Sequence, residues 1–151
     1  MGYTVYFTRT DDQVLSRDQL ICIAYEAQKY AGKYQANVII SPDETCVTVS
    51  GGCESLLLPT NANQLFYTRV GSTVYQFCKT NGYAYDRLVK TILMYLLSIG
   101  VISQFSHDGD KPELVGDVDA ELYKGLSGND YTAEVGNELI ANDPESDDDY
   151  F

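Results

Sequence analysis

The sequence predicts an α+β fold in which an antiparallel sheet carries two main helices packed on one face. Strand-like runs rich in β-branched and aromatic residues precede, separate and follow two segments with helical hydrophobic spacing. The strands do not alternate regularly with helices, as they would in a doubly wound fold. A Gly-Ser turn also joins two of the runs as a hairpin. The expected order is therefore β-α-β-β-(β)-β-β-α-β.

The first two elements have clear sequence signals. Residues 3–9 form an aromatic and β-branched run that predicts a strand ending at Asp11 and Asp12. Ser16 then offers an N-cap with Gln19 three residues later, which is a capping-box pattern. Apolar residues recur behind it at helical spacing up to Gly32, so an amphipathic helix is expected there.

The middle of the chain predicts short strands separated by turn residues. Strands are expected over residues 38–40, 45–49 and 53–58, with Pro42, Gly51-Gly52 and Pro59 between and after them. Residues 65–70 and 73–79 flank Gly71-Ser72, a dipeptide that suits a type II′ turn.

A two-residue turn sets the register of this hairpin. It pairs Val70 with Thr73, Thr68 with Tyr75, and Phe66 with Phe77. The aromatic face with Phe66, Tyr75 and Phe77 is expected to point inward. Tyr67, Arg69 and Cys78 belong to the other, mixed face.

The second helix is expected over residues 84–99 as the central helix of the core, because residues 92–97 are apolar almost all round. Asp86 and Lys90 are four residues apart and should pair, and Gly100 marks the end. A strand over residues 101–105, a turn over 106–110 and a short helix over 117–126 complete a predicted single domain of residues 1–126.

The distribution of charge differs between the predicted domain and the C-terminal part of the chain. Residues 1–110 carry eight Lys or Arg against ten Asp or Glu, whereas residues 111–151 carry two Lys against twelve acids, and the net charge is −12. Residues 127–151 are therefore expected to form an acidic, flexible tail, because self-repulsion and low apolar content do not offset the entropy of ordering.

Several classes of site are disfavoured by the sequence. No apolar run approaches the roughly 20 residues that a bilayer requires, and no leader precedes the first strand, so a cytoplasmic protein without a membrane partner is expected. The four cysteines are predicted to be small core residues, and no cofactor is expected. Zinc is disfavoured by the absence of paired ligands. The cysteines are Cys22, Cys46, Cys53 and Cys78.

Catalytic and cation-binding patterns are weak, so a non-enzyme is expected. Cys78 and His107 could be a nucleophile and a base, but nothing in the sequence places them within hydrogen-bond reach of each other. Asp108 and Asp110 could bind Mg²⁺ or Ca²⁺, although a turn is the preferred interpretation.

The first candidate site is the aromatic and basic stretch from Phe66 to Lys90. Cations that follow phosphates and aromatic rings that stack on bases are the two features of single-stranded nucleic-acid binding. The alternative is that the rings are core and the cations only solubilise the surface. On the binding hypothesis, the contact residues are Tyr67, Arg69, Lys79 and Tyr83.

The second candidate is the acidic segment over residues 142–151, in which acids are followed by aromatic residues. It resembles the acidic tails of bacterial and phage single-stranded-DNA-binding proteins, although it has no long Gly/Pro/Gln-rich linker. The resemblance implies docking of a protein partner with a basic surface, against the alternative of a merely solvated end. The partner-binding residues would be Asp147, Asp148, Asp149, Tyr150 and Phe151.

A further resemblance covers about residues 66–126. The F-x-K-T segment at Phe77, the Tyr85-Asp86 pair at the start of an apolar helix, and the S-x-D-G-D turn from Ser106 are similar to a set of uncharacterised bacterial and phage proteins. This resemblance implies a common fold and no known activity. Thr80 and Asp86 are expected to have structural roles, as turn former and first-turn acid.

Together these patterns predict a non-catalytic accessory protein of nucleic-acid metabolism from a phage or mobile element. It would act through protein contacts, with single-stranded DNA as an optional further ligand. One alternative is that the chain is an acidic protein that mimics DNA and thereby inhibits a host defence enzyme. Another is a viral structural component, and the sequence leaves the oligomeric state open.

Overall fold

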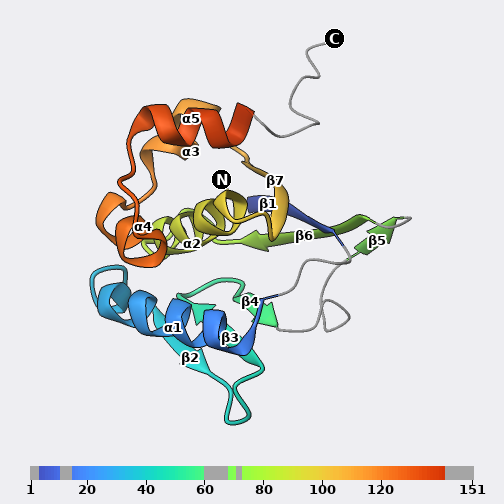
Figure 1. The fold of residues 1–151 in the computed structure, drawn as a ribbon, viewed down its shortest axis with the longest axis vertical. Coiled ribbons are helices and arrows are strands. Elements are labelled where there is room, and N and C mark those ends of the chain that lie inside the picture. Colours follow the sequence, from blue (N-terminus) through green and yellow to red (C-terminus); the bar gives the residue numbers. More distant parts are fainter. Residues whose placement is uncertain (1–3, 11–14, 60–67, 71–72, 142–151) are drawn as a thin grey trace.

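The computed structural model describes residues 4–10, 15–59, 68–70 and 73–141 (Figure 1). The α+β class is confirmed, and the first nine elements follow the predicted order. The elements are β1 (Thr4–Thr10), α1 (Arg17–Ala31), β2 (Asn37–Ile40), β3 (Cys46–Ser50), β4 (Leu56–Pro59), β5 (Thr68–Val70), β6 (Thr73–Lys79), α2 (Asp86–Ser98), β7 (Ile102–His107), α3 (Lys111–Gly116), α4 (Ala120–Ser127) and α5 (Ala133–Ala141).

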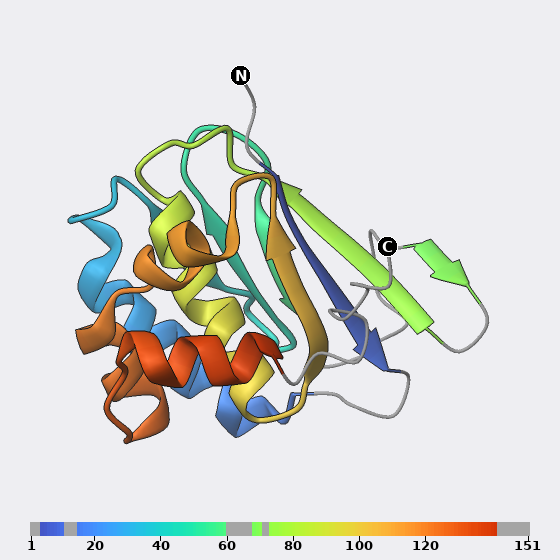
Figure 2. The same cartoon turned by 90° about the horizontal axis from the view of Figure 1, so that it is seen from above.

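The described strands form two antiparallel sheets, whereas the sequence analysis expects one. Sheet A has the order β5-β6-β1-β7, and sheet B has the order β2-β3-β4. The helix α1 packs on β2 and β3, while α2 packs on β7. Each main helix is thus attached to its own sheet, and a shared core lies between them. Figure 2 shows the helices gathered beyond the β7 edge of sheet A, with β1, β6 and β5 extending away from them.

The start of α1 follows the predicted capping box. The Ser16 side chain accepts from the backbone N–H of Gln19 at 3.1 Å, and the Gln19 side chain accepts from the Ser16 backbone at 2.8 Å. Each contact satisfies a backbone donor that the helix leaves without a partner. The buried face of α1 consists of Leu20, Ile23, Ala24 and Ala27.

The described part of the hairpin has the predicted register, but Phe77 and Cys78 face the sides opposite to those expected. Phe66, the expected partner of Phe77, lies outside the described residues. Thr68 pairs with Tyr75 and Val70 with Thr73, as expected. Phe77, however, is 60% exposed, whereas Cys78 is 1% exposed. The expectation that Phe77 points inward is therefore wrong. The reason is the pairing with β1, because Cys78 lies directly opposite Val5, which is fully buried, and directly paired residues point to the same side of a sheet.

The helix α2 contains a buried ion pair within its apolar surroundings. Lys90 has no exposed surface, and its Nζ lies 2.7 Å from Asp86 Oδ2 and 2.8 Å from Asp117 Oδ2. Thr80, also fully buried, donates its hydroxyl proton to the same Asp86 carboxylate. The predicted pairing of Asp86 with Lys90 is confirmed, but as part of a buried network that includes the segment before α4.

A second carboxylate fixes α4 against α1. Asp119 accepts from the backbone N–H groups of Glu121 and Leu122 at 3.0 and 3.1 Å, and so caps α4. Its other oxygen accepts from the Tyr34 hydroxyl and from Lys33 Nζ at 3.2 Å. Burial opposes the charged form, but these hydrogen bonds outweigh it and lower the pKa of Asp119.

The folded body continues past residue 126. The sequence predicts one short helix over residues 117–126 and then a tail, whereas the structure has α3, α4 and α5. Ile140 of α5 is 4% exposed and belongs to the main core. The Tyr131 hydroxyl donates to the Val115 carbonyl oxygen at 2.8 Å, which ties the approach to α5 to α3. Residues 127–141 thus differ from the expected tail, and residues 142–151 lie outside the described residues.

The cysteines do not share one environment. Only Cys78 is buried among them; Cys22 is exposed, and Cys46 and Cys53 are intermediate. The interpretation of all four as core residues is therefore wrong for Cys22, whereas Cys53 is partly buried and packs against the core, and Cys46 is half-buried. Alternation places Cys46 beside the inward-facing Val47, and Cys22 lies beside Ile23 on the edge of the buried face of α1. No helix within the described ranges is long and apolar enough to cross a bilayer.

Replacing Lys90 by Met should lower the free energy of unfolding by about 3 kcal/mol or more, because the Asp86 and Asp117 carboxylates would lose their common cation while Asp86 stays buried. Urea denaturation should show a lower midpoint at an unchanged m-value. Lys124→Met is the matched control, since the Lys124–Asp130 pair is exposed and should contribute less than about 1 kcal/mol. Equal effects of the two substitutions would contradict a stabilising role of the buried pair.

Candidate binding surface

Two aromatic side chains lie side by side on the outer face of sheet A. Tyr6 of β1 pairs directly with Phe77 of β6, and on its other side with Ser106 of β7. Tyr6 is 44% and Phe77 60% exposed. Directly opposed residues of an antiparallel pair have Cβ atoms roughly 5 Å apart, so both rings rise from neighbouring positions. We call Tyr6, Phe77, Lys79 and Ser106 the aromatic face.

The inner side of the same strands explains why this exposure is unusual. Val5, Phe7 and Phe105 alternate with the outer residues and are at most 4% exposed. Sheet A therefore already has a well-filled apolar side. An additional pair of exposed rings on its outer side contributes nothing to that core, and such exposure is typical of a contact surface.

Tyr6 is held in place by Asp108, which follows β7. The Tyr6 hydroxyl donates to Asp108 Oδ1 at 2.9 Å, and the Thr4 backbone N–H donates to Asp108 Oδ2 at 2.9 Å. The hydrogen bond to Asp108 raises the pKa of Tyr6, with smaller contributions from burial and from the charge of Asp108. The Tyr6 hydroxyl therefore stays neutral, and the hydrogen bond holds the ring in place beside the exposed Asp108 carboxylate.

Lys79 and Tyr83 lie close to the aromatic face in sequence and are both exposed. Lys79 is the last residue of β6 and pairs with Thr4. A turn over residues 80–83 follows, with positive φ at Asn81 and Gly82, and Tyr83 is 45% exposed. The Tyr83 ring lies over Gly52, where an added Cβ would come within 3.0 Å of it. One cation and one further ring are thus available at this end of β6.

The remaining predicted contact residues cannot be placed on this surface. Tyr67 lies outside the described residues, and Arg69 is placed only by its backbone pairing with Val74. The predicted partner-binding residues, Asp147 to Asp149 with Tyr150 and Phe151, also lie outside the described residues. Of the four predicted nucleic-acid contacts, the structure therefore shows Lys79 and Tyr83 as exposed side chains.

The pair of Cys78 and His107 does not have the geometry of a nucleophile and its base. Both residues pair with Val5, one from each side, so β1 separates them by two strand spacings, roughly 10 Å. The Cys78 thiol contacts the Glu54 carbonyl oxygen at 3.4 Å, and His107 Nε2 lies 2.7 Å from the Asp110 carbonyl oxygen. Burial raises the pKa of Cys78 to about 12, which is opposite to what an activated thiol requires.

The acids of the 106–110 turn have structural partners. Asp108 binds Thr4 and Tyr6, as described above, and Asp110 caps α3 by accepting from the Glu113 backbone N–H at 2.8 Å. Within the described ranges, no three His, Cys, Asp or Glu side chains are grouped as metal ligands. The strand β7 continues through Ser106 and His107, two residues beyond the predicted strand, so the expected turn is confined to residues 108–110.

The comparisons leave the interpretation to the structure itself. No family model, no curated protein and no solved structure matches the chain.

The assignment of the two sheet faces has a direct test. Phe77→Ala should change the free energy of unfolding by no more than about 0.5 kcal/mol, because the side chain is exposed. Phe105→Ala, on the inner side of the same sheet, should cost about 3 kcal/mol or more. Thermal or urea denaturation measures both. A large loss of stability for Phe77→Ala would restore the inward orientation that the sequence predicts.

Proposed function

We propose that the chain is a non-catalytic accessory protein of nucleic-acid metabolism that binds a protein partner with a basic surface through the aromatic face. The observation that carries the proposal is the adjacent exposure of Tyr6 and Phe77 on a sheet whose other side already forms the core. Aromatic side chains in the centre of a contact surface often contribute most of its binding energy. The proposed origin in a phage or mobile element is supported by the sequence resemblances alone.

The charge of the chain favours a protein over a nucleic acid as the main partner. The net charge is −12, and Asp108 lies beside Tyr6. A polyanion approaching this surface would meet repulsion, with Lys79 as one compensating cation. A basic protein would instead be attracted over a long range, and its association would be faster at low salt.

Single-stranded DNA is the second candidate ligand. It is favoured by one specific arrangement, the exposed rings of Tyr6 and Phe77 with the exposed Lys79 two residues further along β6. Bases stack on aromatic rings of this kind regardless of sequence, and a neighbouring cation can follow the phosphates.

Capture from a nuclease-treated bacterial lysate tests the leading proposal, with the full chain as bait. The double substitution Tyr6→Ser with Phe77→Ser should remove at least nine-tenths of a specific partner, because both anchors are lost. Ile39→Ser is the matched control, since Ile39 is equally exposed, at 60%, on sheet B. A partner retained by the double variant, or lost equally with Ile39→Ser, would refute the aromatic face as the contact surface.

Fluorescence anisotropy with a labelled oligothymidine separates the two ligands. The leading proposal expects no binding even at low salt. The second candidate expects binding that weakens as salt is added and that disappears in the Tyr6 and Phe77 double variant. Binding that survives this variant would place any DNA contact elsewhere.

The acidic residues 147–149 are proposed to assist capture of the same basic partner. Replacing Asp147, Asp148 and Asp149 by Asn should weaken capture several-fold at low salt and have less effect at 0.5 M salt, because charge attraction is screened. Tyr150→Ser with Phe151→Ser leaves those charges intact and tests the aromatic contribution separately. If neither change alters capture under any salt condition, the acidic segment is not a contact.

A further inference from the structure

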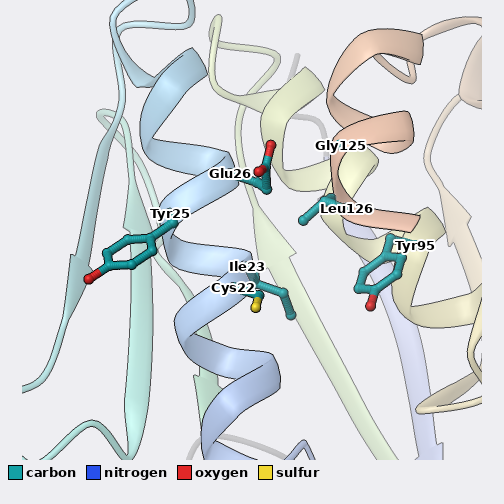
Figure 3. Close-up of a pocket in the computed structure, with 7 residues that line it drawn as sticks. All are labelled: Cys22, Ile23, Tyr25, Glu26, Tyr95, Gly125 and Leu126. Carbon is teal, nitrogen blue, oxygen red and sulfur yellow. The ribbon is translucent and has the colours of Figure 1, made fainter. Parts of the chain in front are cut away.

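A separate pocket of about 240 Å³ lies between α1, α2 and α4 (Figure 3). This volume is below the roughly 300–1,000 Å³ of typical small-molecule sites, so the pocket suits one side chain better than a cofactor. Figure 3 shows the Tyr25 ring turned away from the other labelled side chains. The lining residues are Cys22, Ile23, Tyr25 and Glu26 of α1, Tyr95 of α2, and Gly125 and Leu126 of α4.

The lining combines apolar surface with one carboxylate. Ile23 and Leu126 provide aliphatic walls, and Tyr95 provides a ring. Burial raises the pKa of Tyr95, so its phenol stays neutral. Glu26 is the charged residue of the lining, and its side chain is 26% exposed. Its Oε2 is 3.0 Å from Lys29 Nζ, which leaves Oε1 for a further donor.

Gly125 makes room for this carboxylate. A Cβ at residue 125 would lie 2.4 Å from Glu26 Oε1, so a larger residue would displace the carboxylate from its position between the helices. Glycine inside a helix is less favourable than alanine. Here the missing side chain of α4 leaves room for Glu26 Oε1, and this allows the carboxylate to lie at the pocket.

We propose that this pocket binds an arginine side chain presented by a partner protein. The guanidinium group would donate to Glu26 Oε1 and lie against the Tyr95 ring, while the aliphatic stem would contact Ile23 and Leu126. Arginine fits better than lysine, because its planar group can both pair with a carboxylate and stack on a ring. The net charge of −12 favours an occupant of positive charge.

The pocket is independent of the aromatic face. All of its lining residues belong to α1, α2 and α4, whereas the aromatic face belongs to the strands of sheet A. The inference therefore goes beyond the proposed function, and either site can be present without the other.

The test is a titration of the full-length ¹⁵N-labelled protein with N-acetyl-arginine methylamide, followed by NMR. Saturable shifts are expected at the amides of residues 22–26 and 125–126, with a dissociation constant of about a millimolar, as is reasonable for a single side chain. N-acetyl-citrulline methylamide has nearly the same shape without the charge, and should bind at least tenfold more weakly.

Two variants and two matched controls decide whether the pocket is the site. Glu26→Gln keeps the shape and should weaken arginine binding at least fivefold, whereas Glu138→Gln, an exposed acid on α5, should not. Gly125→Ala should abolish binding while preserving or raising the melting temperature. Gly32→Ala places a methyl group in open space at the end of α1 and should leave binding unchanged.

The inference is overturned if citrulline binds as well as arginine, if no saturable shifts occur, or if Gly125→Ala binds normally. If Glu26→Gln and Glu138→Gln weaken arginine binding equally, the binding is due to diffuse charge attraction. That result would overturn the inference as well. The Tyr6 and Phe77 double variant should bind the arginine compound like the wild type. Failure of the pocket is therefore distinguishable from failure of the aromatic face.

Discussion

The fold depends on the burial of one ammonium group. Lys90 lies in the apolar helix α2 with no exposed surface, and a charge in that position requires matching carboxylates. Asp86 satisfies part of this requirement from the same helix, and Asp117 from the segment that leads to α4. The position of that segment places Asp119 next to Thr91 and Tyr34, so that α4 is held against both α2 and α1. The three-helix arrangement around the pocket thus follows from the contacts that Lys90 and Asp119 require.

The sequence predicts those parts of the fold that depend on local patterns. The capping box at Ser16 and the hairpin register around Gly71-Ser72 are short-range features, and both were predicted from neighbouring residues. The pairing of Asp86 with Lys90 was predicted from helical spacing, but spacing contains no information about burial. The contribution of Asp117, which is 27 residues away from Lys90, depends on tertiary packing and could not be predicted in the same way.

The candidate site was predicted less well, and the reason lies in strand pairing. Register along a hairpin fixes which residues are neighbours, but the inward face depends on the strand next to it. Here that strand is β1, which pairs Val5 with Cys78 and Tyr6 with Phe77. When the pairing with β1 is not known, hydrophobicity is the only guide to the inward face, and it favours the face that carries the aromatic residues. Lys79 and Tyr83, two of the contacts that the binding hypothesis names, are exposed in the structure, but their role as contacts stays a prediction.

Charged side chains are usually exposed and aromatic side chains are usually buried. In this structure one pair of each type has the opposite location, and the two cases have different explanations. Buried Lys90 and Asp86 are explained within the chain, since each has its partners and the network joins helices. The exposed rings of Phe77 and Tyr6 are not explained in this way: Tyr6 donates a hydrogen bond to Asp108, but the sheet has its core on the other side, and neither ring contributes to it. Glu26 and Gly125 belong with the exposed pair, because a helix-interior glycine that accommodates a carboxylate at a pocket does not stabilise α4. These exposed rings and the glycine–carboxylate contact do not stabilise the fold, so contact with a binding partner is the simplest physical reason for them.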